Sequence, residues 1–238
     1  MFDGTCECQV ITANCHSGAS VLSSYDAKST RPRSMRSTTS TAFVRCATLL
    51  LSAAPASAAL LSPVESPPVL NSPVFSLATL NPDGSTNMNI LTYATPAGVK
   101  PRLWAISLFR KTRTHANFVS ERSGILQLLS EPHSSLVYTL GGQSAADVDK
   151  AAACANAGFG WLDGPGEGTA MVLPGCASYI RLVQVGELQD AGEHDLALCR
   201  VEEFLVEAQG ATDEVALSTA ALREAGIITD RGKAIEPK

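Results

Sequence analysis

Alternating apolar and polar positions predict a series of short β-strands in the first half of this 238-residue chain. Residues 73–80 (PVFSLATL) form one apolar run, and the NPDG sequence at 81–84 is a turn, because proline presets φ and glycine tolerates a positive φ. Residues 87–94 alternate and predict a second strand. Its one face carries Asn87, Asn89, Leu91 and Tyr93, and its other face carries Met88, Ile90 and Thr92.

Further strands and a few helices follow. Residues 102–109 (RLWAISLF) come after a loop and are nearly continuous in apolar residues, so we expect a strand buried on both faces. Residues 124–130, 177–188 and 194–206 predict three more strands, the last two forming an antiparallel pair joined by 189–193. Helices are expected at 114–121, 132–140, 144–156 and 219–225. About six mostly antiparallel strands with helices at the edges predict an α+β domain resembling a β-barrel.

The turn between the third strand and the first helix carries the clearest candidate chemistry. Arg110, Lys111, Thr112, Arg113 and Thr114 place three cations and two hydroxyls before a helix N-terminus, where unpaired N–H groups favour an anion. The turn therefore fits a phosphate. The alternative is a solvated basic turn in which Thr114 caps the helix.

Several motifs, taken in order, resemble the flavin reductase-like domain, the FMN-binding split-barrel family. The motif positions are Gly84, Asn87, Thr92, Pro101, Arg110 and Thr114, followed by GGQSAADVDK at 141–150 and GEHDLALCRV at 192–201. The resemblance covers about residues 73–233. It implies a mostly antiparallel split β-barrel with peripheral helices, a homodimer, and FMN near the subunit interface.

The resemblance also gives roles to individual residues. Arg110, Lys111, Thr112 and Thr114 would anchor the phosphate through charge-assisted hydrogen bonds. Polar partners for the flavin would be Asn89, Thr92 and Tyr93, the backbone at Leu91 and Ala94 would face the ring, and Asn87 and Ser107 would be further contacts. The alternative for these positions is a strand face whose polar groups are satisfied by neighbouring strands. His194 would dock the nicotinamide or tune the flavin. It follows Glu193, where the family has Asp, and a histidine on an exposed hairpin is the alternative.

Two classes of function follow from this resemblance. One is an NAD(P)H-dependent flavin reductase, or an oxidoreductase that keeps FMN (or FAD) as a prosthetic group and receives hydride from NAD(P)H. The other is a non-enzymatic FMN-binding electron carrier or sensor. A degenerate barrel that binds haem, or no flavin, is a third possibility. We expect the glycine-rich residues 158–168 to form a mobile loop over a pocket, and this loop and His194 would leave open or close a nicotinamide slot.

The net charge and the absence of several sequence motifs argue against other classes of function. A net charge of −5 argues against a general nucleic-acid binder. The sequence has no recognisable Ser/His/Asp or Cys/His signature, no GxGxxG after a strand and no Walker-type loop. We expect His115 at the surface, with helix capping or a phosphate contact as the alternative. We expect His133 in a structural role, and Cys154, Cys176 and Cys199 as buried free thiols.

The first 58 residues are predicted to be a targeting leader. They are rich in Ser and Thr, more basic than acidic, and end in an apolar run at 47–54 that is too short to span a bilayer. A plastid is the favoured destination, with a mitochondrion or a secretory route as alternatives; no membrane partner is expected. Zinc at Cys6, Cys8 and Cys15 is disfavoured by their spacing. Residues 59–72 are a Pro-rich connector to a domain at 73–238.

Overall fold

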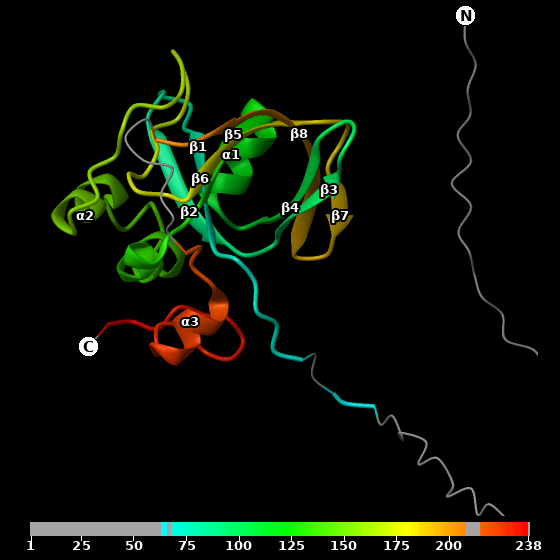
Figure 1. The fold of residues 1–238 in the computed structure, drawn as a ribbon. Helices are drawn as coiled ribbons and strands as arrows, with labels where there is room; N and C mark the ends of the chain where they lie inside the picture. Colours follow the sequence, from blue (N-terminus) through cyan, green and yellow to red (C-terminus); the bar gives the residue numbers. More distant parts are fainter. Residues whose placement is uncertain (1–62, 66–67, 208–214, 238) are drawn as a thin grey trace, which may run out of the picture. The chain divides into compact units, whose positions relative to one another are not determined.

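The computed structural model describes residues 63–65, 68–207 and 215–237, and in this part of the chain the strands form one antiparallel sheet (Figure 1). The strands are β1 (Phe75–Leu80), β2 (Thr86–Leu91), β3 (Ala94–Gly98), β4 (Leu103–Phe109), β5 (Ser123–Leu128), β6 (Ser178–Gln184), β7 (Gln189–Ala191) and β8 (His194–Leu205). Their order is β2-β1-β5-β6-β8-β4-β3, and β7 pairs with β8. The helices are α1 (Arg113–Glu121), α2 (Lys150–Asn156), α3 (Thr219–Glu224), a 3-10 helix (Glu131–Leu136) and a π turn (Tyr138–Gly142).

The connectivity requires the sheet to curl. β2 and β3 are the two ends of the strand order, yet only Thr92 and Tyr93 separate them in sequence. The three steps from Leu91 to Ala94 span at most about 11 Å, so the opposite edges of the sheet must approach one another. Within the described residues β2 and β3 are not paired, so the barrel is split along this seam. The predicted antiparallel split barrel is confirmed.

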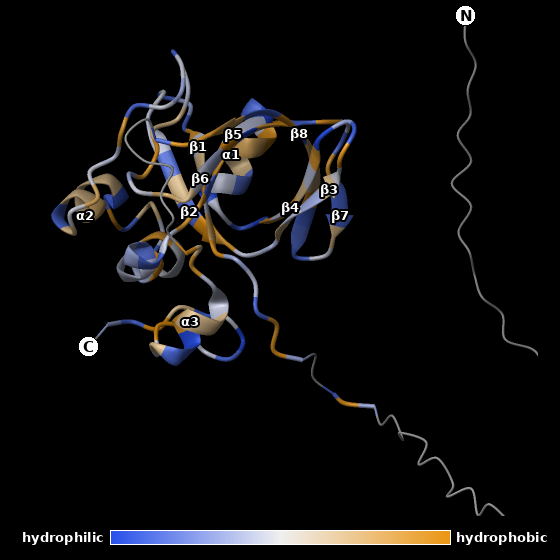
Figure 2. Ribbon diagram, in the orientation of Figure 1, coloured by the Kyte–Doolittle hydropathy of each residue, from blue (hydrophilic) through white to orange (hydrophobic). Residues whose placement is uncertain are grey.

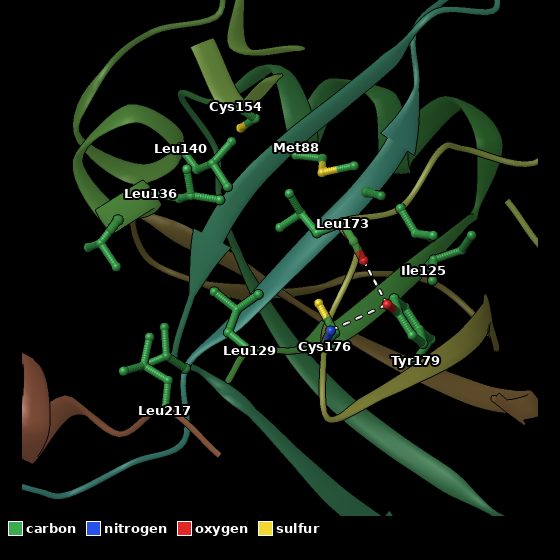
Figure 3. Packing of buried hydrophobic residues seen from close by; sticks show 14 of the residues in the cluster. Met88, Ile125, Leu129, Leu136, Leu140, Cys154, Leu173, Cys176, Tyr179 and Leu217 are labelled. Carbon is green, nitrogen blue, oxygen red and sulfur yellow. Dashed lines mark hydrogen bonds between the residues drawn. The ribbon is translucent and has the colours of Figure 1, made fainter. Parts of the chain in front are cut away.

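Two apolar cores lie on the two faces of the curled sheet. The inner cluster takes Phe75 and Leu77 from β1 together with Phe118 of α1, which packs against β1, β2, β4 and β5. The outer cluster, seen in Figure 3, takes Ala78 from β1 and Met88 from β2, and the short helices and the loop before β6 cover it. β1 contributes to both clusters, and its buried residues therefore run almost without interruption.

Two strand predictions were wrong in detail. β4 is not buried on both faces: Ile106 and Leu108 are buried, whereas Ser107 is half-buried and Phe109 is exposed. The second strand does not continue to residue 94, because the chain leaves β2 after Leu91 and enters β3 at the opposite edge of the sheet. The loop expected before β4 is therefore mostly strand. The apolar–polar alternation of the sequence continues through Thr92 and Tyr93. It therefore does not reveal that β2 pairs with β1 whereas β3 pairs with β4.

Two helix starts also differ from the prediction. Thr112, not Thr114, caps α1, and its side chain accepts a hydrogen bond from the His115 N–H. α2 begins at Lys150 with Asp149 as its cap, whereas Ser144 only closes a turn by accepting a hydrogen bond from the Ala146 N–H. Both sequences contain several residues that can cap, and packing decides which of them is used.

The connector and the C-terminal helix are joined by hydrogen bonds. Ser72 and Thr219 exchange two bonds, from the Ser72 N–H to the Thr219 hydroxyl and from the Thr219 N–H to the Ser72 carbonyl, each of 2.9 Å. Arg223 donates to the Leu70 carbonyl at 3.0 Å. The predicted leader and its cysteines lie outside the described residues. Cys154, Cys176 and Cys199 are buried and not disulfide-bonded, as predicted. No helix in the described part is long and apolar enough to cross a membrane.

Candidate functional site

Two cavities flank the seam of the split barrel. We call the smaller one, of about 450 Å³, the β4 groove, and the larger one, of about 910 Å³, the α3 cavity. Both are lined by Ser72, Thr92 and Tyr93. The two-residue crossing between β2 and β3 is therefore a wall that the cavities share, and both volumes lie in the range of small-molecule sites.

The β4 groove is an apolar slot with hydroxyl groups on its lining. Trp104 of β4 and Leu196 of β8 supply apolar surface, and Ser107 and Thr92 supply hydroxyls. Neither hydroxyl has a hydrogen-bond partner among the described residues. A flat apolar wall with unpaired hydroxyls suits a planar ring that has polar atoms on its edge.

The α3 cavity lies between the outer face of β2, the connector and the C-terminal segment. Val74, Ile90 and Leu222 give it apolar walls, and Arg223 and Arg231 are among its charged lining residues. Arg223 is held in place by the carbonyls of Leu70 and Asp230. The cavity therefore combines an apolar floor with an orientated guanidinium.

Three aromatic rings pack beside the groove. The imidazole of His194, the first residue of β8, lies 5.2 Å from the ring of Phe109 and 5.8 Å from that of Tyr93. Tyr93 lines both cavities and Phe109 ends β4, so these contacts bring the start of β8 to the barrel seam. The imidazole of His194 has no hydrogen-bond partner among the described residues, which leaves both ring nitrogens available to a ligand.

The basic turn is neutralised in part by carboxylates. Arg110 donates from Nε and Nη2 to one oxygen of Asp195, at 3.0 and 2.5 Å, and lies 3.2 Å from Asp190. The other Asp195 oxygen is 2.7 Å from Nε2 of His115. These partners, Arg110 first and His115 second, lower the pKa of Asp195 to about 2, and the carboxylates raise the pKa of Arg110. His115 is thus half-buried and engaged, and its predicted surface position was wrong.

Two of the predicted cofactor contacts instead fix α1 to the sheet. Asn87 is buried and donates to the hydroxyl of buried Thr114 at 2.8 Å. Asn117, also on α1, donates to Thr79 and to Asn81. The hydroxyl of Thr114 is therefore satisfied by the protein and faces neither cavity.

The structure brings part of the predicted site together. Leu91, Thr92, Tyr93, Ala94 and Ser107 line one or both cavities. Arg110, Lys111 and Thr112 lie at the adjoining turn, where Lys111 is exposed and Thr112 caps α1. Asn89 lines neither cavity, although its buried Oδ1 has no partner among the described residues.

Sequence reasoning missed Trp104, Leu196, Ser72 and Arg223. Trp104 and Leu196 lie in strands whose alternating apolar pattern does not distinguish a core residue from a groove residue. Ser72 and Arg223 lie in segments that carry no motif. The glycine-rich loop was placed wrongly: none of residues 158–168 lines either cavity, and Phe159 and Trp161 pack on the outer core. His133 is structural as predicted, with its ring nitrogens bonded to Ser130 and to the Pro174 carbonyl.

Comparison with known proteins places these features in a family. The profile of the flavin reductase like domain matches residues 69–223, more than half of the chain. No curated protein matches the sequence significantly.

Solved structures share the fold at low sequence identity. Flavoredoxin from Methanosarcina acetivorans aligns with a TM-score of 0.55 and 14% identity over 68% of this chain and 92% of its own. The FMN-binding protein from Thermus thermophilus, with bound p-hydroxybenzaldehyde, gives 0.53 and 21% over 66% and 84%. The NADH:FAD oxidoreductase of Streptomyces globisporus C-1027 gives 0.52 and 13% over 63% and 81%. At these identities the likeness establishes the fold alone.

Proposed function

Because the chain belongs to the flavin reductase like domain family, we propose that it is an oxidoreductase that binds FMN in the β4 groove and reduces it with NADH or NADPH. The observation that carries this proposal is the groove itself. It is a slot of about 450 Å³ at the barrel seam, with apolar walls and hydroxyls of Thr92 and Ser107 that nothing else in the described residues uses.

The residues present fit a flavin ring. Trp104, Pro96 and Leu196 offer apolar surface, and Thr92 and Ser107 can hydrogen-bond to the polar edge of an isoalloxazine. A bound flavin would supply an N5 atom that accepts hydride from a reduced nicotinamide. FAD is the alternative flavin, since the Streptomyces globisporus relative is an NADH:FAD oxidoreductase and the Thermus thermophilus relative an FMN-binding protein.

The α3 cavity supports a reductase over an electron carrier. It adjoins the β4 groove at Thr92 and Tyr93, so the rest of a dinucleotide could lie in it while the nicotinamide ring passes these two residues and contacts the flavin directly, as hydride transfer requires. A carrier would be expected to cover that face. The loop at 158–168, which was the candidate cover, lines neither cavity and packs on the outer core instead.

His194 is proposed to orient the ligands, not to transfer a proton. Its contacts with Tyr93 and Phe109 fix the plane of the imidazole beside the groove, where its unpaired nitrogens could bond to the flavin or to the nicotinamide carboxamide. Stacked rings on one side of the slot would also exclude water from the reacting atoms.

A second copy of the chain is proposed to cover the groove. Phe109, Leu196 and Leu198 on β4 and β8 are each more than a third exposed, although all three are large and apolar. Apolar side chains gathered on one sheet face mark an interface in soluble proteins. We therefore expect a homodimer by light scattering, and we expect Leu198→Lys to convert it to a monomer.

A flavin titration tests the binding claim. FMN fluorescence should be quenched with saturation by the purified chain, and Ser107→Ala should weaken the affinity about five- to tenfold through the loss of one hydrogen bond. Ser120→Ala is the matched control, because Ser120 is exposed on α1 and its hydroxyl contacts only Glu121. Equal affinities for the wild type and Ser107→Ala would contradict the assignment of the groove.

A further inference from the structure

Two aspartates face each other on the hairpin next to the basic turn. Asp190 of β7 pairs directly with Asp195 of β8 in the antiparallel ladder. Like charges directly opposite on neighbouring strands destabilise a sheet. Arg110 lies between them, bonded to Asp195 and 3.2 Å from Asp190, and offsets this repulsion. In Figure 2 the hairpin at β7 is mostly hydrophilic in colour; Asp190 is its exposed aspartate, whereas the side chain of Asp195 is largely buried.

This arrangement occupies the guanidinium that a phosphate would need. Both Arg110 nitrogens that point to Asp195 donate to a single oxygen, and the second oxygen of Asp195 holds His115. An anion approaching Arg110 would therefore meet the carboxylates of Asp195 and Asp190, which already lie against the guanidinium. Lys111 is left as an exposed cation at this turn without a carboxylate partner among the described residues.

The cluster is within reach of a flavin in the β4 groove. Ser107 lines the groove, and Arg110 lies three residues further along the chain, just past the end of β4, about 10 Å away at the rise of an extended chain. On the neighbouring strand Leu196 lines the groove and pairs with Ser107, whereas Asp195 lies on the opposite face, against His115 of α1. Arg110, past the end of β4, reaches Asp195 around the end of the strand. The phosphate of a ribityl chain that leaves the groove in this direction would approach the Arg110 cluster.

We propose that Asp190 and Asp195 set the flavin specificity of the site by keeping Arg110 from the flavin phosphate, so that the phosphate adds little to binding and the flavin exchanges as a substrate. This inference rests on the proposed function, because it needs a flavin in the β4 groove. It assigns to the two aspartates a role opposite to that of a phosphate anchor: they disfavour the phosphate and leave recognition to the ring.

The test compares FMN with riboflavin, which lacks the phosphate. Affinities for both flavins are measured by fluorescence quenching for the wild type, Asp190→Asn and Asp195→Asn. Asp190 is the safer variant, because its side chain is 75% exposed and asparagine can still accept the hydrogen bond from the Gly192 N–H. Glu193→Gln is the matched control, since it removes the same charge from the same hairpin without a side-chain contact to Arg110.

We expect the wild type to bind FMN within about threefold of riboflavin. Each aspartate variant should bind FMN about fivefold more tightly at low salt, with riboflavin unchanged and the gain reduced at high salt. A wild type that strongly prefers FMN, aspartate variants with an unchanged ratio, or an equal gain in Glu193→Gln would overturn the inference while flavin binding stands. Binding of neither flavin to the wild type would overturn the proposed function and the inference together.

Discussion

Lys150 is a buried ammonium whose loss should change how stability depends on pH. It is 8% exposed, and its Nζ donates to the carbonyls of Met88 at 3.0 Å and Leu140 at 2.8 Å. No carboxylate pairs with it among the described residues, and burial lowers its pKa to about 8. The two bonds hold the π turn (Tyr138–Gly142) against β2, whose Ile90 lines the α3 cavity.

The magnitude follows from the difference between the folded and unfolded pKa values. An unfolded lysine titrates near 10.4, so folding lowers the pKa of Lys150 from about 10.4 to about 8, which corresponds to about 3 kcal/mol. Allowing for residual solvation of the ammonium, we expect about 2 kcal/mol. Because the folded pKa is the lower one, the unfolded chain binds more protons between about pH 8 and pH 10.4. The cost of burying the charged ammonium is therefore present in full below pH 8. It decreases as the pH rises to 10.4, and the free energy of unfolding increases by the same amount.

The assay measures the free energy of unfolding in urea from pH 7 to pH 10.5 for the parent and for Lys150→Met. Both are made in a Cys154→Ala background, because the nearby Cys154 thiol interacts electrostatically with Lys150 and has a raised pKa. Other titrating groups cancel in the difference. The parent should gain about 2 kcal/mol relative to Lys150→Met above pH 8, with a constant difference below it. A constant difference over the whole range, or a loss by the parent, would refute the reasoning.

Three further predictions concern single side chains. His133→Ala should lower the free energy of unfolding by about 2–4 kcal/mol without changing flavin affinity, because it removes a fully buried ring bonded to Ser130 and to the loop before β6; urea denaturation and a flavin titration check this. Tyr179→Phe should cost about 1–2 kcal/mol, since its hydroxyl donates to the Leu173 carbonyl at 2.7 Å (Figure 3), and an unchanged melting temperature would contradict this. Thr92→Val keeps the shape of the wall shared by both cavities and removes its hydroxyl, so flavin affinity should fall about fivefold while the melting temperature stays within a few degrees.

Local signals predicted much of the fold because the elements that carry them are self-contained. The turn at Gly84, with φ of 81°, and the long alternating strand β8 were both readable from the sequence. β3 was not, because the chain passes through Thr92 and Tyr93 without a break in alternation and only the sheet order shows that it has changed edges. Strand partners depend on contacts distant in sequence, and residue spacing does not report them.

The candidate site was predictable from sequence where a motif lies at the barrel seam. It was not predictable where a side chain is paired with residues that are distant in the sequence. Thr92 and Tyr93 line both cavities, as a site at this strand end requires. Arg110 looked like a phosphate anchor because its carboxylate partners are about 80 residues away in sequence. Thr114 looked like a helix cap or phosphate ligand, yet the cap is Thr112, two residues earlier, and the Thr114 hydroxyl faces Asn87 instead. Side-chain pairing across the fold decides these roles.

The most direct test of the central claim is an anaerobic absorption spectrum of the purified chain with FMN, recorded before and after addition of NADH or NADPH. Our account predicts that the flavin spectrum shifts on binding, and that the flavin bands then bleach with at least one of the two nicotinamides, faster than without protein and more slowly in His194→Ala. A flavin spectrum that the chain leaves unchanged, or bound flavin bands that neither nicotinamide bleaches, would contradict it.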